Sequence, residues 1–138
     1  MKDPEEILEL GTPGPMRDAL VACVLSGEKT ATSSLLAQYE DEDEQDPLPK
    51  PGTRLTMVDS DEEPVAIVEI VGVDVIRLGD ADLQLALDEG EGFRSVAEWR
   101  AAHVRFWSEE IRPLLDDPSA LAIDDDTTVV VERFRLVA

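Results

Sequence analysis

The sequence predicts an α+β domain in which helices interrupt the strands of one small curled sheet. Two stretches have the pattern of helices, at 13–26 and 95–112, and they alternate with runs rich in β-branched residues at 54–59, 64–77 and 127–137. Strands interrupted by helices and closed by a C-terminal strand are typical of this class. A length of 138 residues and a hydrophobic fraction of 43% suit one domain with its own core.

The first helix is expected to begin near residues 13–15 and to end at Ser26, because proline suits a first turn and Gly27 suits a C-cap. The single cysteine, Cys23, cannot form an internal disulfide and is expected to be a small core residue. The other apolar residues at helical spacing are Met16, Leu20, Val24 and Leu25. A second, short helical piece is expected over 34–39.

Residues 40–52 are expected to form a loop, because six acidic residues crowd against prolines there, which favours contact with solvent. A lid that repels phosphate is the alternative interpretation of this loop. The strand over 54–59 is expected to turn at 60–63 into a long strand over 64–77. Within that strand Gly72 is expected to form a bulge or a bend.

A helical turn around 82–88 is expected to lead into a glycine-rich acidic segment. Ser95 and Glu98 have the spacing of a capping box, so the second long helix is expected to start there. It should run to about Arg112, before the proline that follows. The closing strand is expected over 127–137.

The charge balance limits the partners. With 32 acidic and 12 basic residues the net charge is −20, which repels polyanions and argues against DNA as a partner. The start is acidic, unlike a signal peptide, and no apolar run reaches the roughly 18 residues of a membrane span. We therefore expect a cytoplasmic protein without membrane contact. The sequence makes no prediction of the oligomeric state.

Lys29 is the first candidate for chemistry, because this cation follows the helix-ending Gly27. Its neighbours are small hydroxyl residues: Thr30, Thr32, Ser33 and Ser34. One interpretation is a charge near the negative end of the helix dipole. In the other, Lys29 is partly buried and takes a proton from a hydroxyl, or stays charged and binds an oxyanion or a phosphate. A bend after Gly27 is needed to bring Lys29 and Thr32 together.

Glu89 and Glu91 are the second candidate, because they alternate with Gly90 and Gly92, which let the backbone approach a ligand closely. Either carboxylate could orient Lys29 or act as a general acid or base, and the alternative is a polar loop before a helix. Two carboxylates also suit a divalent ion. However, no aspartate–histidine spacing completes such a site, so we expect neither a metal nor another cofactor.

The helix from Ser95 is the third candidate, because its region holds four of the basic residues, the only histidine and both tryptophans. Aromatic rings interleaved with Arg100 suit a nucleobase and its phosphate. Arg94, next to the helix N-terminus, is the expected anion contact. The alternative is that Trp99 belongs to the core and that His103 is a structural group.

These segments resemble those of the ASCH domain family, whose fold is related to the PUA barrel of RNA-modifying proteins. Residues 27–32 match the family's glycine-x-lysine-threonine-x-threonine motif. Residues 89–95, together with 98–100 and His103, are similar to the longer-chain branch of the family. The stretches 49–54 and 130–134 also fit.

The resemblance implies one domain over 1–138, a small PUA-like mixed β-barrel with flanking helices, and RNA or a small nucleoside as the partner. In some members it implies hydrolysis. Cleavage of the amide in N4-acetylcytidine would use Thr32 as the nucleophile, with Lys29 and either Glu91 or Glu89. The family often has an arginine shortly after the second threonine, whereas two serines follow here.

Ribonuclease cleavage is the second activity that the resemblance implies, near parity with the first. It would depend on Lys29, Arg94, Ser95 and His103. The substrate contacts implied for this chain are Thr30, Arg94, Ser95, Arg100 and His103. A non-catalytic RNA-binding or regulatory module is the alternative to both hydrolases.

Overall fold

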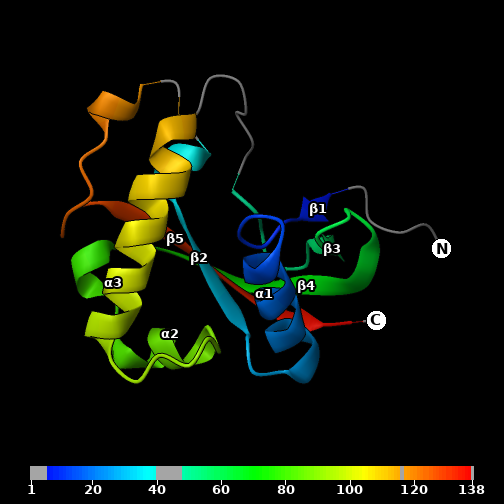
Figure 1. The fold of residues 1–138 in the computed structure, drawn as a ribbon. Coiled ribbons are helices and arrows are strands. Elements are labelled where there is room, and N and C mark those ends of the chain that lie inside the picture. The colour runs from blue at the N-terminus through cyan, green and yellow to red at the C-terminus, as the bar shows by residue number, and fades with distance from the viewer. Residues whose placement is uncertain (1–5, 40–47, 116, 138) are drawn as a thin grey trace.

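A long antiparallel strand pair forms the centre of the sheet. β4 (Pro64–Arg77) pairs with β3 (Arg54–Val58) on one side and with β5 (Thr128–Leu136) on the other. The edges are β1 (Ile7–Leu8), which is parallel to β3, and β2 (Ala31–Leu35), which is antiparallel to β5. The order β1-β3-β4-β5-β2 therefore makes a mixed five-stranded sheet (Figure 1).

The computed structural model describes residues 6–39, 48–115 and 117–137. Most of the predicted acidic loop, residues 40–47, lies outside the described residues. The described end of that loop makes a turn at Gly52, whose φ of 93° is left-handed, before β3 begins.

Helices and turns fill the connections between strands. The α-helices are α1 (Pro15–Ser26), α2 (Leu83–Asp88) and α3 (Val96–Phe106). The remaining helical pieces are a π-turn at Trp107–Ile111 and 3₁₀ turns at Leu36–Gln38, Leu78–Asp80, Arg112–Leu114 and Pro118–Ala120. Figure 1 shows α1 and α3 on either side of β2. The predicted α+β class is confirmed.

The described sheet is open, so it does not close into the barrel that the family resemblance implied. The outward backbone of the edge strand β2 explains why no further strand is needed there. The carbonyl of Ala31 accepts a hydrogen bond of 2.9 Å from Lys29 Nζ, and the amide of Leu35 donates one of 2.9 Å to the side chain of Gln38. Side chains thus satisfy backbone groups that a neighbouring strand would satisfy in a closed barrel.

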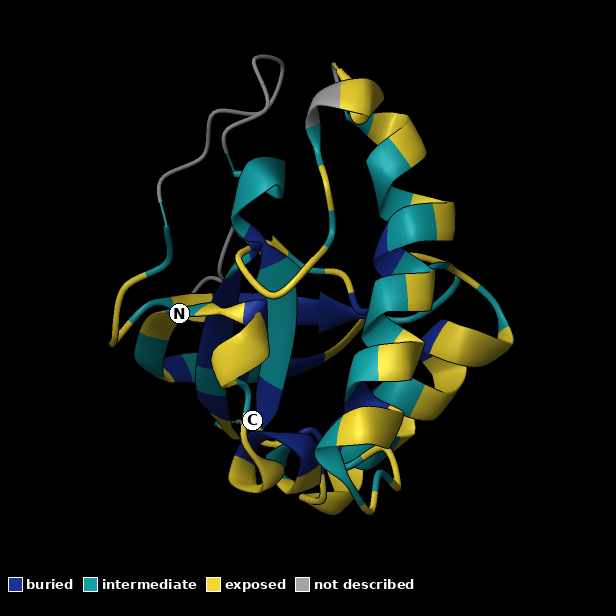
Figure 2. Ribbon diagram, turned by 90° about the vertical axis from the view of Figure 1, so that its left-hand side faces the viewer, coloured by how far each residue is buried: buried dark blue, intermediate teal, exposed yellow. Residues whose placement is uncertain are grey.

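Two apolar clusters cover the two faces of the sheet. Val21 and Val24 of α1 pack on one face, where Phe134 and the apolar residues of β3 and β4 lie. Trp99 and Trp107 pack on the other face, against the alternating apolar residues of β2 and β5. Figure 2 shows this division, with buried strands inside and the outer surface of the helices exposed. β2 contributes Ala31 and Leu35 to the second cluster only.

The buried side of α1 differs from the expected one. Arg17, Val21 and Val24 are buried, whereas Met16 and Leu25 are exposed, and Cys23 is only half-buried. Arg17 explains the difference, because its guanidinium donates to the carbonyls of Leu10 (3.1 Å), Gly11 (3.3 Å) and Asp59 (3.4 Å). These bonds turn the arginine inward and the neighbouring methionine outward.

The other boundaries follow the sequence closely, with three corrections. The expected helical piece over 34–39 is only a 3₁₀ turn at Leu36–Gln38, because Ser34 and Leu35 pair with β5. The helix expected to end near Arg112 loses its α-helical bonding after Phe106. The short strand β1 had no predicted counterpart. The bulge at Gly72 is confirmed by a register shift between β4 and β5.

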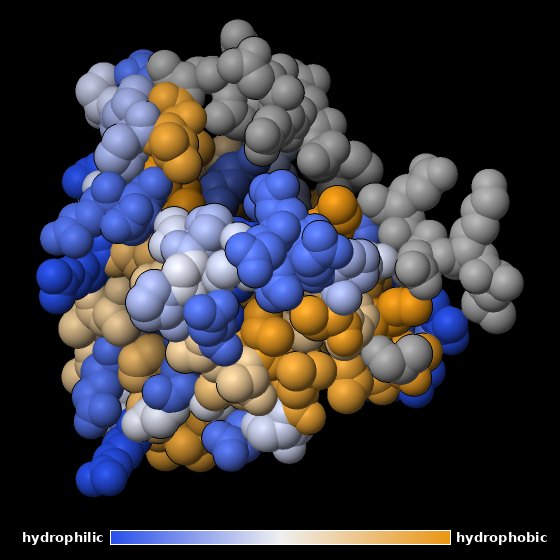
Figure 3. Space-filling model, turned by 45° about the vertical axis from the view of Figure 1, so that its right-hand side comes forward, coloured by the Kyte–Doolittle hydropathy of each residue, from blue (hydrophilic) through white to orange (hydrophobic). Residues whose placement is uncertain are grey.

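The described surface mixes polar and apolar side chains, and apolar groups gather on part of the face shown in Figure 3. Within the described ranges, the helices are all too short or too polar to cross a membrane.

Replacing Arg17 should test the bonds that orient α1. Arg17→Leu removes a donor from three carbonyl groups, of which that of Asp59 still accepts from the amide of Glu62, so the free energy of unfolding should fall by about 2–4 kcal/mol. Urea denaturation measures this change. The matched control is Arg105→Leu, which breaks only an exposed pair with Glu109 and should cost less than about 0.5 kcal/mol. Equal losses for both variants would contradict this role of Arg17.

Candidate functional site

The chain bends sharply between α1 and β2, and the bend directs Lys29 into the interior. Gly27 ends α1 with a left-handed φ of 85°. The amide of Lys29 then donates to the carbonyl of Cys23 (3.0 Å), and the amide of Thr30 donates to that of Asp88 (2.8 Å). As a result Lys29 is 2% exposed, although it lies at the start of an edge strand.

The ammonium group of Lys29 lies among acceptors from β2 and from the loop that follows α2. Nζ donates to the carbonyl of Ala31 (2.9 Å), to the carbonyl of Glu89 (3.3 Å) and to Oε2 of Glu91 (3.2 Å). It also forms an ion pair of 3.6 Å with Oε1 of Glu89. Lys29 therefore links the start of β2 to the glycine-rich loop that contains Glu89 and Glu91.

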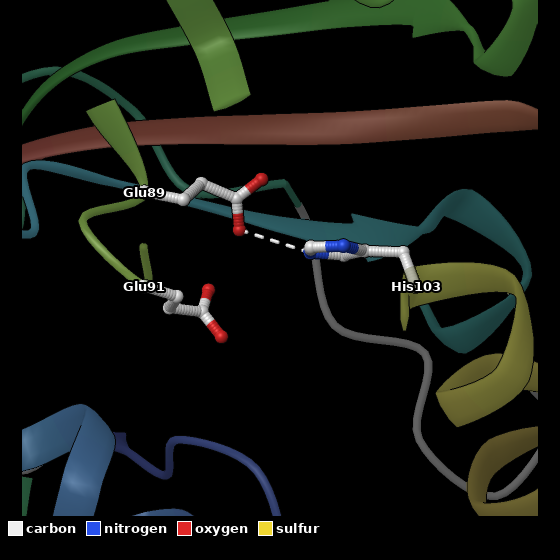
Figure 4. A group of neighbouring side chains, drawn as sticks. All are labelled: Glu89, Glu91 and His103. Carbon is white, nitrogen blue, oxygen red and sulfur yellow. Dashed lines mark hydrogen bonds and ion pairs between the residues drawn. The ribbon is translucent and has the colours of Figure 1, made fainter. Parts of the chain in front are cut away.

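Glu89 is the centre of this cluster. Its carboxylate is buried, with an exposed fraction of 1%. Oε2 accepts hydrogen bonds from the hydroxyl of Ser33 (2.9 Å) and from the indole N–H of Trp99. Oε1 lies 3.0 Å from Nε2 of His103 (Figure 4). Together with Lys29, groups from β2 and α3 thus surround a single carboxylate.

The two nitrogens of His103 have different roles. Nδ1 lies 2.8 Å from the carbonyl oxygen of Trp99. Because a carbonyl can only accept, Nδ1 carries a proton. The contact between Nε2 and Glu89 therefore needs one further proton, which either the imidazole or the carboxyl group must supply.

The pKa shifts place that proton on the histidine. Burial by itself raises the pKa of Glu89, but the hydrogen bond and charge of His103, the charge of Lys29 and the bond from Trp99 outweigh it, so the pKa lies below its ordinary value. Burial by itself lowers the pKa of His103, but the hydrogen bond and charge of Glu89 outweigh it, so the pKa lies above its ordinary value. An imidazolium–carboxylate pair results.

Aromatic rings enclose the histidine. The ring of His103 stacks on Trp99 with centroids 4.4 Å apart, and it meets the edge of Trp107 at 5.3 Å and Phe93 at 5.7 Å. Both tryptophans are almost fully buried. Both are core residues in this structure. For Trp99 this agrees with the second of the two interpretations of the sequence, a core position instead of a contact with a nucleobase.

Glu91 differs from Glu89 in being accessible. Its side chain is 26% exposed, and it comes from the same loop, beside the Glu89–His103 pair (Figure 4). Gly90 lies between them with a φ of 67°, and a Cβ there would lie 2.3 Å from the carbonyl oxygen of Glu28. The loop is thus pressed against the backbone that precedes Lys29.

The remaining predicted residues lie outside this hydrogen-bonded cluster. Thr30 is exposed, and its hydroxyl contacts the carbonyl of Asp88 at 3.4 Å. Ser95 caps α3 by accepting from the amide of Glu98 at 3.1 Å. Arg100 pairs with the exposed carboxylate of Asp125.

Arg94 and Thr32 also lie outside the cluster. Arg94 is exposed and has no ion pair within the described residues. Thr32 faces the opposite side of β2 from Ser33, because successive strand residues alternate. It is nevertheless next to Ala31, whose carbonyl binds the ammonium of Lys29.

Ser33 is the residue that sequence reasoning did not select. Its hydroxyl donates to Glu89, but in the sequence it is only one of several hydroxyl residues after Lys29. A strand assigned to 31–35 could have found it, because such a strand places Ser33 on the same face as Ala31 and Leu35.

A group of possible metal ligands does exist in the fold. Glu89, Glu91 and His103 each offer one ligand atom, and these atoms lie within 4.8 Å of one another. The pattern was not visible as a spacing, because α3 folds back onto the loop. Lys29 already provides a positive charge 3.2 Å from Glu91, so these carboxylates do not require a metal for charge balance. The expectation of no metal stays a prediction.

A family model and one of the similar solved structures both name the ASCH domain. The sequence model of the ASCH domain matches residues 6–138. A crystal structure of a protein from Enterococcus faecalis has a TM-score of 0.82 and 28% identity, covering 96% of this chain and 76% of that one. The ASCH domain from Lactobacillus crispatus has a TM-score of 0.74 and 28% identity, covering 87% and 71%. No curated protein matches this chain in sequence.

Two glycines allow a matched test of the loop. Gly90→Ala places a methyl group against the Glu28 carbonyl, whereas Gly92→Ala meets no atom within 4 Å, although both have positive φ. Gly92→Ala should cost about 1 kcal/mol of unfolding free energy, and Gly90→Ala about 3 kcal/mol or more. Thermal denaturation of both variants checks this. If the two were equally stable, the close packing of the loop on Lys29 would be disproved.

Because of the Glu89–His103 pair, the free energy of unfolding should decrease at both low and high pH. Because the pKa of His103 is raised by folding, His103 adds to the free energy of unfolding. This addition is complete below the ordinary histidine pKa of 6.5 and is lost as pH rises through the raised pKa. Because the pKa of Glu89 is lowered by folding, Glu89 also adds to the free energy of unfolding. This addition is complete above the ordinary glutamate pKa of 4.5 and is lost as pH falls through the lowered pKa. The stability difference between wild type and His103→Gln should therefore be largest between 4.5 and 6.5.

Urea denaturation of both proteins between about pH 3 and pH 9 measures this difference, because titrations that the two proteins share largely cancel. A difference that does not change with pH would contradict the assigned protonation states.

Proposed function

The chain belongs to the ASCH domain family, and from this premise we propose that it binds RNA or a nucleoside and hydrolyses an amide on an uncharged nucleoside. ASCH domains are generally RNA-binding, which supports the first part. The second part rests on the geometry around Lys29.

The observation that carries the proposal is the Lys29–Glu91 pair. A buried ammonium, 1% exposed in its side chain, holds a carboxylate that is 26% open to solvent. Burying a lysine is costly unless its charge is compensated, and here the compensation fixes a carboxylate at the boundary between core and solvent. A carboxylate positioned in this way suits a general base.

The proposed reaction uses Thr32 as the nucleophile. Its Oγ1 forms a bond to the acyl carbon, and the hydroxyl proton passes to Glu91 through a water molecule at the edge of the sheet, because Thr32 and the Lys29–Glu91 pair lie on different faces of β2. The C–N bond then breaks, and the leaving nitrogen takes that proton back from Glu91. Water hydrolyses the resulting ester, which releases the acid and restores the threonine hydroxyl. Lys29 orients Glu91, and Glu89 holds Lys29.

The ion pairs of Lys29 and His103 favour an amide substrate over a phosphodiester. Lys29 and His103 are both paired with Glu89, and the side chain of His103 is only 11% exposed. Both of its nitrogens are already bonded, so it is poorly placed to exchange protons with RNA. Ribonuclease chemistry would need at least one of these groups to be available.

A non-catalytic RNA-binding module is the second candidate, and Arg94 favours it. This exposed cation follows the glycine-rich loop and has no ion pair within the described ranges, so it is available to a phosphate. Under this alternative the Glu89 cluster is purely structural.

Three substitutions should separate catalysis from folding. Thr32→Val removes the nucleophile, Glu91→Gln removes the base, and Lys29→Met removes the group that orients it. Each should lower kcat for N4-acetylcytidine by about 100-fold or more, whereas the exposed Glu110→Gln should leave it within about twofold. Chromatographic detection of released cytidine gives the rates, and circular dichroism confirms folding.

Single-stranded RNA serves as the second substrate in the same assay. If wild type hydrolyses neither substrate, both enzymatic functions are rejected. RNA binding without cleavage, reduced by Arg94→Ala, would then establish the module.

A further inference from the structure

The face of β2 opposite Ser33 carries the proposed nucleophile, Thr32, and beside it a carboxylate that the proposed reaction does not use. In the register of the sheet, Thr32 lies opposite Glu132 of β5, and Glu132 lies opposite Val73 of β4. In the next row Ser34 lies opposite Val130. Directly paired residues share a face, so these side chains form a patch on the side of the sheet covered elsewhere by α1.

Glu132 is the unusual member of this patch. It is 6% exposed, yet within the described residues its only hydrogen bond comes from the hydroxyl of Tyr39 to Oε1. In the same part of the chain no side-chain nitrogen or oxygen is both fully buried and unpaired. The second carboxylate oxygen, Oε2, has no hydrogen bond to a described residue and is therefore not fully buried.

Two hydroxyl residues lie on the same face of the neighbouring strand, Thr32 directly opposite Glu132 and Ser34 one row further along. Thr32 and Ser34 are half-buried, and their side chains make no hydrogen bond to any described residue. Val73, half-buried, and Val75, half-exposed, provide an apolar border on β4. A few unsatisfied polar groups with an apolar border are typical of small-molecule sites.

The electrostatics of the patch select the kind of ligand. Burial raises the pKa of Glu132 above its ordinary value, and the bond from Tyr39 offsets only part of this effect. No charged group contributes to the shift, so the carboxyl group has no neighbouring cation to compensate it. An anionic ligand would find no cation here to compensate its charge, whereas an uncharged N–H donor would satisfy the open oxygen.

We propose that Glu132, Thr32 and Ser34 form a binding subsite for the amino or amide N–H edge of an uncharged nucleobase. Oε2 of Glu132 accepts from the N–H group, the two hydroxyls bond polar atoms of the base, and the valines contact its plane. The subsite rests on the proposed function, since it presents the amide nitrogen of the same nucleoside beside Thr32.

Equilibrium binding of cytidine tests the subsite without any catalytic step. Isothermal titration is performed on wild type, on Glu132→Met, which removes both oxygens, and on Glu132→Gln, which keeps an acceptor. Glu132→Met should weaken binding at least about tenfold, and Glu132→Gln should weaken it less. The control is Glu69→Gln, on the opposite face of the sheet, which should stay within about twofold.

A second ligand tests the chemical group. N4,N4-dimethylcytidine lacks the N–H donor, so wild type should bind it at least about tenfold more weakly than cytidine, and Glu132→Met should not distinguish the two. Equal binding of both ligands by wild type, or undiminished cytidine binding by folded Glu132→Met, overturns the subsite. Failure of wild type to bind cytidine also overturns it.

The two proposals fail in different ways. If N4-acetylcytidine is not hydrolysed but cytidine binding depends on Glu132, the subsite stands and the hydrolase is rejected. If hydrolysis occurs and its KM is the same in Glu132→Met, the hydrolase stands and the subsite is rejected.

Discussion

The arrangement depends on one desolvated carboxylate. Glu89 would be very costly to bury alone, so it must collect donors, and it collects them from three parts of the chain: Lys29, Ser33, and the pair Trp99 and His103. This requirement ties the α1–β2 bend, the edge strand and α3 together. Removing any one donor leaves a charge whose compensation is incomplete, so the core around the tryptophans and the position of Lys29 are coupled.

The two glutamates of the loop differ in exposure, and in the proposed reaction this difference lets a buried cluster position a carboxylate near the surface. Glu89 faces inward and is saturated with donors, whereas Glu91 shares the same lysine but remains partly open. The inner carboxylate therefore acts through position, by fixing the ammonium group that in turn fixes the outer carboxylate. Gly90 makes this possible, since only a residue without a side chain lets the loop approach Glu28 so closely.

Local signals in the sequence were sufficient for most elements and for the choice of Lys29. Gly27 marks the end of α1, Ser95 the start of α3 and Gly72 the bulge, because each acts locally, the glycines through their backbone and Ser95 through its side-chain cap. The sequence did not predict the side-chain contacts between elements that are far apart along the chain. The selection of Ser33 depends on which face of β2 meets Glu89, and the inward position of Arg17 depends on carbonyls up to 42 residues away. Likewise the pairing of Glu132 with Thr32 follows from a register that no local pattern specifies.

The bond from Lys29 to the carbonyl of Ala31 also has a consequence for assembly. An edge strand with free backbone groups is a template on which another chain can add a strand. On β2 a charged side chain occupies one of these groups and the amide of Gln38 occupies another, so the edge is covered from within. The lysine thus protects the molecule against intermolecular β-addition, and a change that withdraws it would favour aggregation through this edge even where the core stays intact.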